Sequence, residues 1–84
     1  MKMGLQDITV TDVFLRETMV EIDGSGFTPY SVVYVNGRRR DDTVYVSPER
    51  LFLPNEARPL SALDEIEVCQ TSPNRVILST AEAP

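Results

Sequence analysis

The chain has 84 residues, of which 42% are hydrophobic and 25% charged, so its length suits one small globular domain. Its formal net charge of −5 disfavours binding to nucleic acid or to anionic membranes, because both attract clustered Lys and Arg. It contains one cysteine and no histidine, which excludes an intramolecular disulfide, histidine-ligated zinc and catalysis through an imidazole. We therefore expect a domain that is not an enzyme and needs no cofactor.

The sequence contains no stretch of about 18 apolar residues, the length of a membrane-spanning helix. The N-terminal residues MKMGLQDITV also lack the apolar region of a signal peptide. We expect either a cytoplasmic protein or a single domain excised from a longer extracellular or cell-envelope protein. Residues 1–84 would form that domain, with its core over about residues 8–80.

The first half of the chain predicts three β-strands. Residues 6–15 and 18–24 alternate apolar and polar side chains, as strands with one buried face do. The apolar positions of these two segments are Ile8, Val10, Val13, Leu15, Val20 and Ile22. Residues 31–35 form a β-branched run that predicts a strand covered on both faces. Asn36-Gly37 then predicts a two-residue hairpin turn, because both central positions of a type I′ turn need a positive φ.

The second half of the chain predicts four more strands and little helix. The strands are expected at residues 43–47, 50–55, 64–70 and 75–80. The last two are predicted to form a hairpin with Pro73 in its loop, and a polar tail follows residue 80. Pro48, Pro54 and Pro59 interrupt the best helical window. Only single turns are expected, at residues 47–50 and around residues 61–64. About seven short strands separated by turn signals predict an all-β sandwich.

Gly24-Ser25-Gly26 could indicate a phosphate-binding or nucleophile loop. The pattern G-x-G-x-x-G fails because Pro29 stands where the third glycine belongs, and no helix is predicted to follow. Ser25 lies directly between the glycines, so the nucleophile pattern G-x-S-x-G is not met either. We interpret the glycines as a bend or bulge at the end of a strand, with Phe27 anchored in the core.

The order of these segments resembles the IPT/TIG family of immunoglobulin-like domains between about residues 8 and 80. The matching positions are Gly24, Gly26, Phe27, Pro29, Val33, Val35, Asn36, Gly37, Val46, Ser47, Leu51, Leu53 and Pro54. The segment LSALDEIEV lacks the glycine that the family usually has before its penultimate strand, and residues 55–63 are harder to align. The resemblance implies an immunoglobulin-like (E-set) sandwich of about seven strands. It also implies an accessory or spacer module, in a bacterial cell-surface or secreted protein, that contacts neighbouring domains or other proteins.

Two sets of residues are candidates for contact with a ligand or partner. Arg38, Arg39 and Arg40 could bind an anion, but Asp41-Asp42 directly follows them and is expected to neutralise much of their charge. We therefore favour a solvated hairpin loop. Tyr34 and Tyr45 are predicted to lie in opposite halves of one hairpin, where they would be cross-strand neighbours. Such tyrosines, together with Tyr30, can stack on sugar rings, so a carbohydrate-binding module is the alternative function.

The remaining polar groups have structural interpretations. Carboxylates that could form a Ca²⁺ site are Asp7, Asp12, Asp23, Asp64, Glu65 and Glu67, but no D-x-D-x-D-G loop accompanies them. We interpret them as solvated strand faces, and Cys69 as a small residue within a strand. Edge strands could pair between copies, so we expect a monomer or a weak homodimer.

Overall fold

The computed structural model describes residues 8–54, 60–74 and 76–84. Its regular structure consists of β-strands, and these residues contain no helix. The strands are β1 (Thr9–Leu15), β2 (Met19–Ser25), β3 (Ser31–Val35), β4 (Arg38–Arg40), β5 (Val44–Ser47), β6 (Arg50–Pro54), β7 (Ile66–Thr71) and β8 (Ile77–Glu82). The all-β prediction is confirmed.

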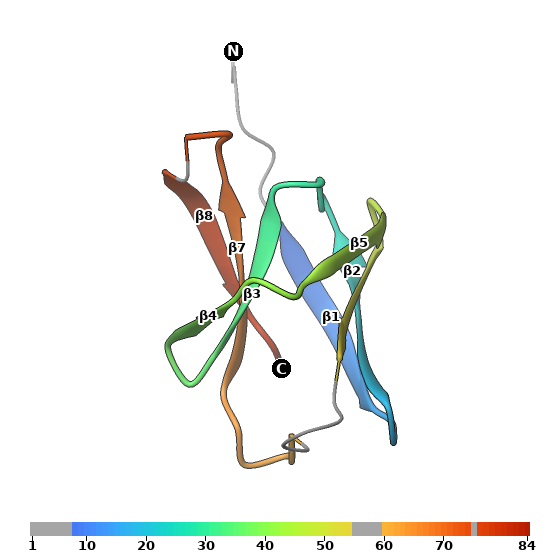
Figure 1. The fold of residues 1–84 in the computed structure, drawn as a ribbon. Coiled ribbons are helices and arrows are strands. Elements are labelled where there is room, and N and C mark those ends of the chain that lie inside the picture. The colour runs from blue at the N-terminus through green and yellow to red at the C-terminus, as the bar shows by residue number, and fades with distance from the viewer. Residues whose placement is uncertain (1–7, 55–59, 75) are drawn as a thin grey trace.

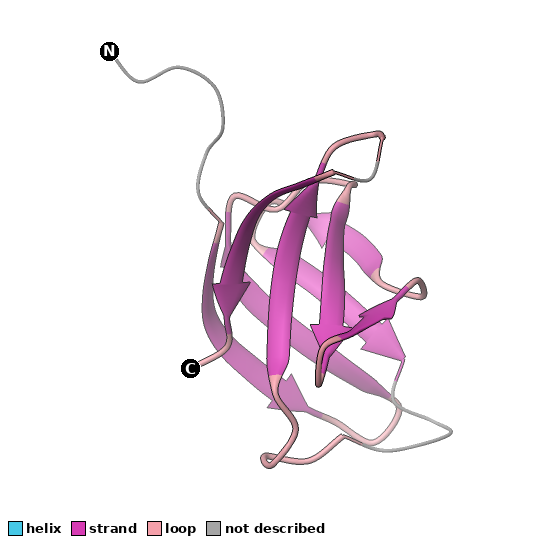
Figure 2. Cartoon of the chain, turned by 90° about the vertical axis from the view of Figure 1, so that its left-hand side faces the viewer, coloured by secondary structure: helices cyan, strands magenta, loops and turns pink. Residues whose placement is uncertain are grey.

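The strands form two antiparallel four-stranded sheets that pack face to face (Figures 1 and 2). The strand orders are β1-β2-β6-β5 and β4-β3-β7-β8. These are the orders of the two sheets of an immunoglobulin-like sandwich, with β4 added as a short edge strand. Consecutive strands cross from one sheet to the other after β2, β4 and β6, which places residues from distant parts of the sequence side by side.

The core lies between the inner faces of the two sheets. Its fully buried side chains come from β2, β3, β6 and β7, all in segments predicted as strands: Val20, Ile22, Val33, Leu51, Leu53 and Val68. Burial of each such aliphatic side chain contributes about 1.5 to 3 kcal/mol. Ile8 and Val10 are buried as predicted, and Val13 packs against the core. Leu15 faces Val20 in the register but is 40% exposed because it ends β1.

The Asn36-Gly37 turn forms as predicted and changes the interpretation of the residues that follow it. Asn36 has a φ of 51° and Gly37 a φ of 80°, so both central positions are left-handed. The two-residue turn places Arg38 opposite Val35 in β3. The arginines therefore continue the hairpin as β4, and the prediction of a solvated loop at residues 38–40 was wrong.

Gly24 and Phe27 have the structural roles that we expected. A Cβ on Gly24 would overlap the carbonyl oxygen of Thr9 in β1 and lie 2.9 Å from Cζ of Phe27. Phe27 itself is buried between the sheets. Gly26, with a φ of 81°, turns the chain out of the first sheet. The bulge lies opposite Gly24, in β1, where Thr11 is inserted between the paired Val10 and Asp12.

Two local predictions need correction. Residues 47–50 form the turn between β5 and β6, with Pro48 and Glu49 at its tip, and not a helical turn. The supposed polar tail after residue 80 belongs to β8, which ends at Glu82, and Ala81 and Ala83 pack against the core. A turn does form at residues 61–64, where the amide of Asp64 donates to the carbonyl of Ser61. Residues 55–59 and Asp7 lie outside the described residues.

Candidate interaction surface

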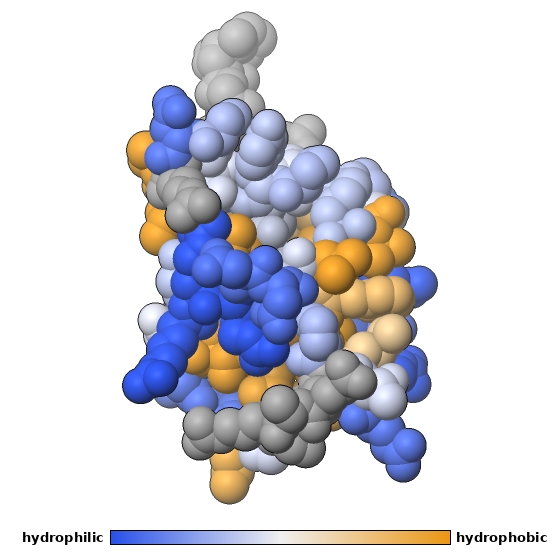
Figure 3. Space-filling view, in the orientation of Figure 1, coloured by the Kyte–Doolittle hydropathy of each residue, from blue (hydrophilic) through white to orange (hydrophobic). Residues whose placement is uncertain are grey.

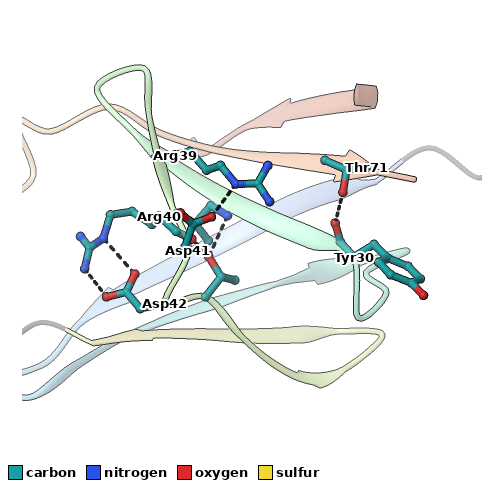
Figure 4. Close-up of polar contacts among 8 residues, drawn as sticks. Tyr30, Arg39, Arg40, Asp41, Asp42 and Thr71 are labelled. Carbon is teal, nitrogen blue, oxygen red and sulfur yellow. Dashed lines mark hydrogen bonds and ion pairs between the residues drawn. The ribbon is translucent and has the colours of Figure 1, made fainter. Parts of the chain in front are cut away.

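The arginine strand β4 is largely neutralised by the two aspartates that follow it (Figure 4). Arg39 Nε lies 2.6 Å from Asp41 Oδ1, and Arg40 donates to both carboxylate oxygens of Asp42 at 3.0 and 2.9 Å. Hydrogen bonding to Asp41 raises the pKa of Arg39 further above its ordinary value. Hydrogen bonding to Arg40 lowers the pKa of Asp42. Two of the three guanidiniums of β4 are therefore paired with carboxylates, whereas the exposed Arg38 forms no ion pair with a described residue.

Tyr34 and Tyr45 do not form a pair, contrary to our prediction. Tyr34 lies in β3 between Arg39 and Glu67, whereas Tyr45 lies in β5 opposite Leu51, in the other sheet. The chain crosses between sheets after β4, so the partner of β3 in the hairpin is β4 and not β5. The two rings therefore do not lie next to each other on one sheet, where they could stack on the same sugar.

Tyr30 is held at an exposed turn by a buried polar network. Ser31 Oγ donates to Gln70 Oε1 at 2.6 Å, and Gln70 Nε2 donates to Thr28 Oγ1 at 2.6 Å. Thr71 Oγ1 donates to the carbonyl of Tyr30 at 2.7 Å (Figure 4). The network fixes the backbone of this turn to β7 and leaves the Tyr30 ring half-exposed.

Ion pairs cover the outer face of the other sheet. Arg50 lies 3.1 Å from Asp23 and 3.5 Å from Glu21, and Arg16 lies 3.5 Å from Glu21. The hydrogen bond to Asp23 raises the pKa of Arg50 above its ordinary value. Asp23 thus faces a guanidinium. Among the described residues, no three His, Cys, Asp or Glu side chains come together in a way that could hold a metal ion.

An open acidic groove lies where β7 and β8 meet the loop before β7. Its volume is about 340 Å³, and its lining includes the carboxylates of Asp64, Glu65, Glu67 and Glu82. Leu63, 93% exposed, stands in its wall. Asp64 also accepts hydrogen bonds from the Asn36 side chain and the Ser61 amide, so it has a structural role.

Two carboxylates of this groove face each other. Glu67 of β7 and Glu82 of β8 are direct cross-strand partners. The amide of Ala83 donates to the carbonyl of Ile66, which makes their neighbours Glu67 and Glu82 a non-hydrogen-bonded pair. Side chains approach each other more closely at such pairs, so like charges there are unfavourable.

Exposed apolar side chains occur on three of the four edge strands, and on β1 they are Phe14 and Leu15, both 40% exposed. Val44, Tyr45 and Val46 are exposed on β5, next to the hydrophilic surface of β4 (Figure 3). At and just before the start of β8, Val76, Ile77 and Leu78 are 57%, 51% and 37% exposed. Edge strands with exposed apolar residues favour contact with other protein chains.

Cys69 is buried in β7, with its Sγ 3.5 Å from Thr80 Oγ1, in agreement with a strand residue.

The part of the chain that the structure describes contains no helix long and apolar enough to cross a membrane. No family model, curated protein or solved structure matches this chain.

Sequence reasoning missed Glu82, Leu63 and the free edge of β8. The signal for Glu82 was the alternation of Ser79-Thr80-Ala81-Glu82, which continues the period of the strand. Its small and acidic residues have low β propensity, so the end of β8 was assigned to a tail. The hairpin of β7 and β8 around Pro73 forms as predicted, but the groove depends on the register of this pair, which the sequence does not specify.

Proposed function

We propose that this chain is a non-catalytic accessory module that contacts other protein domains, within a larger bacterial cell-surface or secreted protein. The observation that carries the proposal is the exposure of apolar side chains along β5 and at the start of β8, the edges of two different sheets. A small acidic domain would keep such edges polar if it had no neighbours. Membership of the IPT/TIG family is part of this proposal, supported by the Gly24-Ser25-Gly26-Phe27 and Val35-Asn36-Gly37 segments.

The experiment compares the isolated domain with the product of its full reading frame. Backbone amide hydrogen exchange would be measured by mass spectrometry on fragments that cover β5 and β8. We expect slower exchange at one or both edges in the longer product, because contact with a neighbour buries them. Equal exchange in both proteins, or a reading frame that encodes no further domain, would contradict the accessory role.

A further inference from the structure

The outer edge of β8 has backbone hydrogen-bonding groups that no partner among the described residues uses. β8 is the last strand of its sheet. The bond from the Ala83 amide to the Ile66 carbonyl, taken with the register, makes the Ala81 and Ser79 positions hydrogen-bonded pairs with β7. Thr80 and Glu82 alternate with them, so their N–H and C=O groups point away from β7, at the outer edge of the sheet. No other backbone hydrogen bond of the described chain uses them.

A bulge limits the edge that is regular enough to be paired. Gln70 pairs with Ser79 and Thr71 with Ile77, which leaves Leu78 as the inserted residue. The segment from Ser79 to Glu82 therefore remains regular, with outward groups at Thr80 and Glu82. Such a segment suits a short added strand, not a long one.

The side chains beside this edge are acidic, so they favour a positively charged partner. Glu67 and Glu82 face each other without a hydrogen bond or ion pair to any cation in the described structure. Glu65 adds a further carboxylate to the same groove. A positive charge placed beside Glu82 would relieve the repulsion in the pair as well as gain attraction of its own.

We propose that the Ser79–Glu82 edge of β8 binds an extended peptide segment of a partner protein, as an added antiparallel strand whose Arg or Lys lies beside Glu67 and Glu82. The backbone of the peptide would bond to Thr80 and Glu82, and its apolar residues would cover Ile77 and Leu78. The proposal rests on the proposed function and adds to it the edge that is used and the chemistry of the partner. The net charge of −5 on this chain disfavours a second copy as the occupant.

The probe is the fluorescein-labelled peptide acetyl-Arg-Val-Thr-Val-Thr-Val-amide, and its matched control replaces the Arg by Glu. Fluorescence anisotropy would measure the binding of both to the intact 84-residue chain. We expect the Glu peptide to bind about tenfold more weakly than the Arg peptide. The substitution replaces an exposed attraction to Glu67 and Glu82 by a repulsion. Glu82→Lys should reverse the preference between the two peptides. Equal binding of the two peptides to the native chain would overturn the proposal.

The backbone part of the proposal is tested by Thr80→Pro, which removes an outward N–H and leaves the bonds of β7 intact. We expect it to weaken binding about fivefold to tenfold, as for one lost hydrogen bond. An N-methylated peptide should lose binding to the native chain in the same way, which keeps the test valid if the proline variant fails to fold. Undiminished binding in both cases would refute strand addition.

Other outcomes separate this inference from the proposed function. The proposal of a basic peptide at β8 would be overturned if neither peptide bound. It would also be overturned if the chain formed a concentration-dependent dimer that Thr80→Pro abolished. Protection of β5 but not β8 in the product of the full reading frame would also overturn it, while supporting the accessory role. Exchange at β5 and β8 that is the same in the isolated domain and in the longer product would contradict the accessory role itself.

Discussion

The side chain of Asn36, in the turn between β3 and β4, holds the loop that precedes β7. Its Oδ1 accepts a hydrogen bond from the Glu65 amide at 2.8 Å, and its Nδ2 donates to Asp64 Oδ1 at 3.0 Å. The Asn36 amide also donates to the Glu65 carbonyl. One residue therefore supplies the left-handed turn and fixes one wall of the acidic groove.

Substitutions at Asn36 should separate these two roles. Asn36→Gly keeps a residue that tolerates positive φ but removes both side-chain hydrogen bonds, so we expect a loss of about 1 to 2 kcal/mol in the free energy of unfolding. Asn36→Ala should lose about 1 kcal/mol more, because alanine disfavours the left-handed region. Urea denaturation measures both. Equal stability of the two variants would show that the φ of 51° carries no cost.

Gly24 should not accept a side chain. We expect Gly24→Ala to lower the free energy of unfolding by about 2 to 4 kcal/mol, since its Cβ would overlap the Thr9 carbonyl and crowd Phe27. Gly37→Ala is the matched control, because a Cβ there meets no atom within 4 Å and only the positive φ is unfavourable. In thermal denaturation, Gly24→Ala should have a clearly lower melting temperature than Gly37→Ala. The reverse order would contradict the close approach of β1 and β2.

Two serines next to Gln70 should respond in opposite ways to replacement by alanine. Ser31→Ala removes the donor to Gln70 Oε1 and the acceptor of the Thr28 amide, so we expect a loss of about 1 to 3 kcal/mol. Ser79, the cross-strand partner of Gln70, has a buried Oγ that finds no hydrogen-bond partner among the described residues. Ser79→Ala should be neutral or stabilising. Chemical denaturation tests the pair, and a large loss for Ser79→Ala would reveal a partner for this hydroxyl.

The ion pair between Arg40 and Asp42 should give a pH-dependent contribution to stability. The pKa of Asp42 is lowered in the folded protein, so the contribution is fully present above the ordinary aspartate pKa of about 3.9. It is lost as the pH falls through the lowered folded pKa. The stability difference between the native chain and Asp42→Asn should therefore be constant near neutral pH and shrink below about pH 4. A difference that grows on acidification would contradict this sign.

Removing one carboxylate of the facing pair in the groove should stabilise the domain. We expect Glu82→Gln to raise the free energy of unfolding by a few tenths to about 1 kcal/mol, because Glu67 then faces a neutral group. The gain should decrease as salt is added. Glu49→Gln makes the same change in charge at the exposed β5–β6 turn and serves as the control. Equal gains in both variants would attribute the effect to net charge alone.

Local patterns predicted most of the strands, whereas the pairing of the central strands, β2 with β6 and β3 with β7, depends on long-range packing. Alternation identified Val20 and Ile22 as buried, and Asn36-Gly37 identified a turn, since both signals act within a few residues. The arginines at 38–40 have little β propensity, but the two-residue turn forces them to pair with β3. The placement of Tyr45 follows from the crossing of the chain to the other sheet, which no local signal specifies.

The candidate surface was less predictable for the same reason. Arg39 and Arg40 were correctly expected to be neutralised by the following aspartates, because residues so close in sequence meet in almost any local structure. Glu67 and Glu82 meet only through the register of β7 and β8. A sequence pattern shows which residues are acidic but not which of them face each other.

The arginine strand β4 also limits how its sheet can be extended by added strands. β4 is only three residues long, and Arg39 and Arg40 are tied back to Asp41 and Asp42. Short, charged strands resist pairing, so this sheet can be extended at β8 but not at β4. A strand added at β8 would make the sheet five-stranded, and β4 would remain its unpaired opposite edge. The stoichiometry at this sheet is then one segment per molecule, and the module cannot propagate through it into a filament.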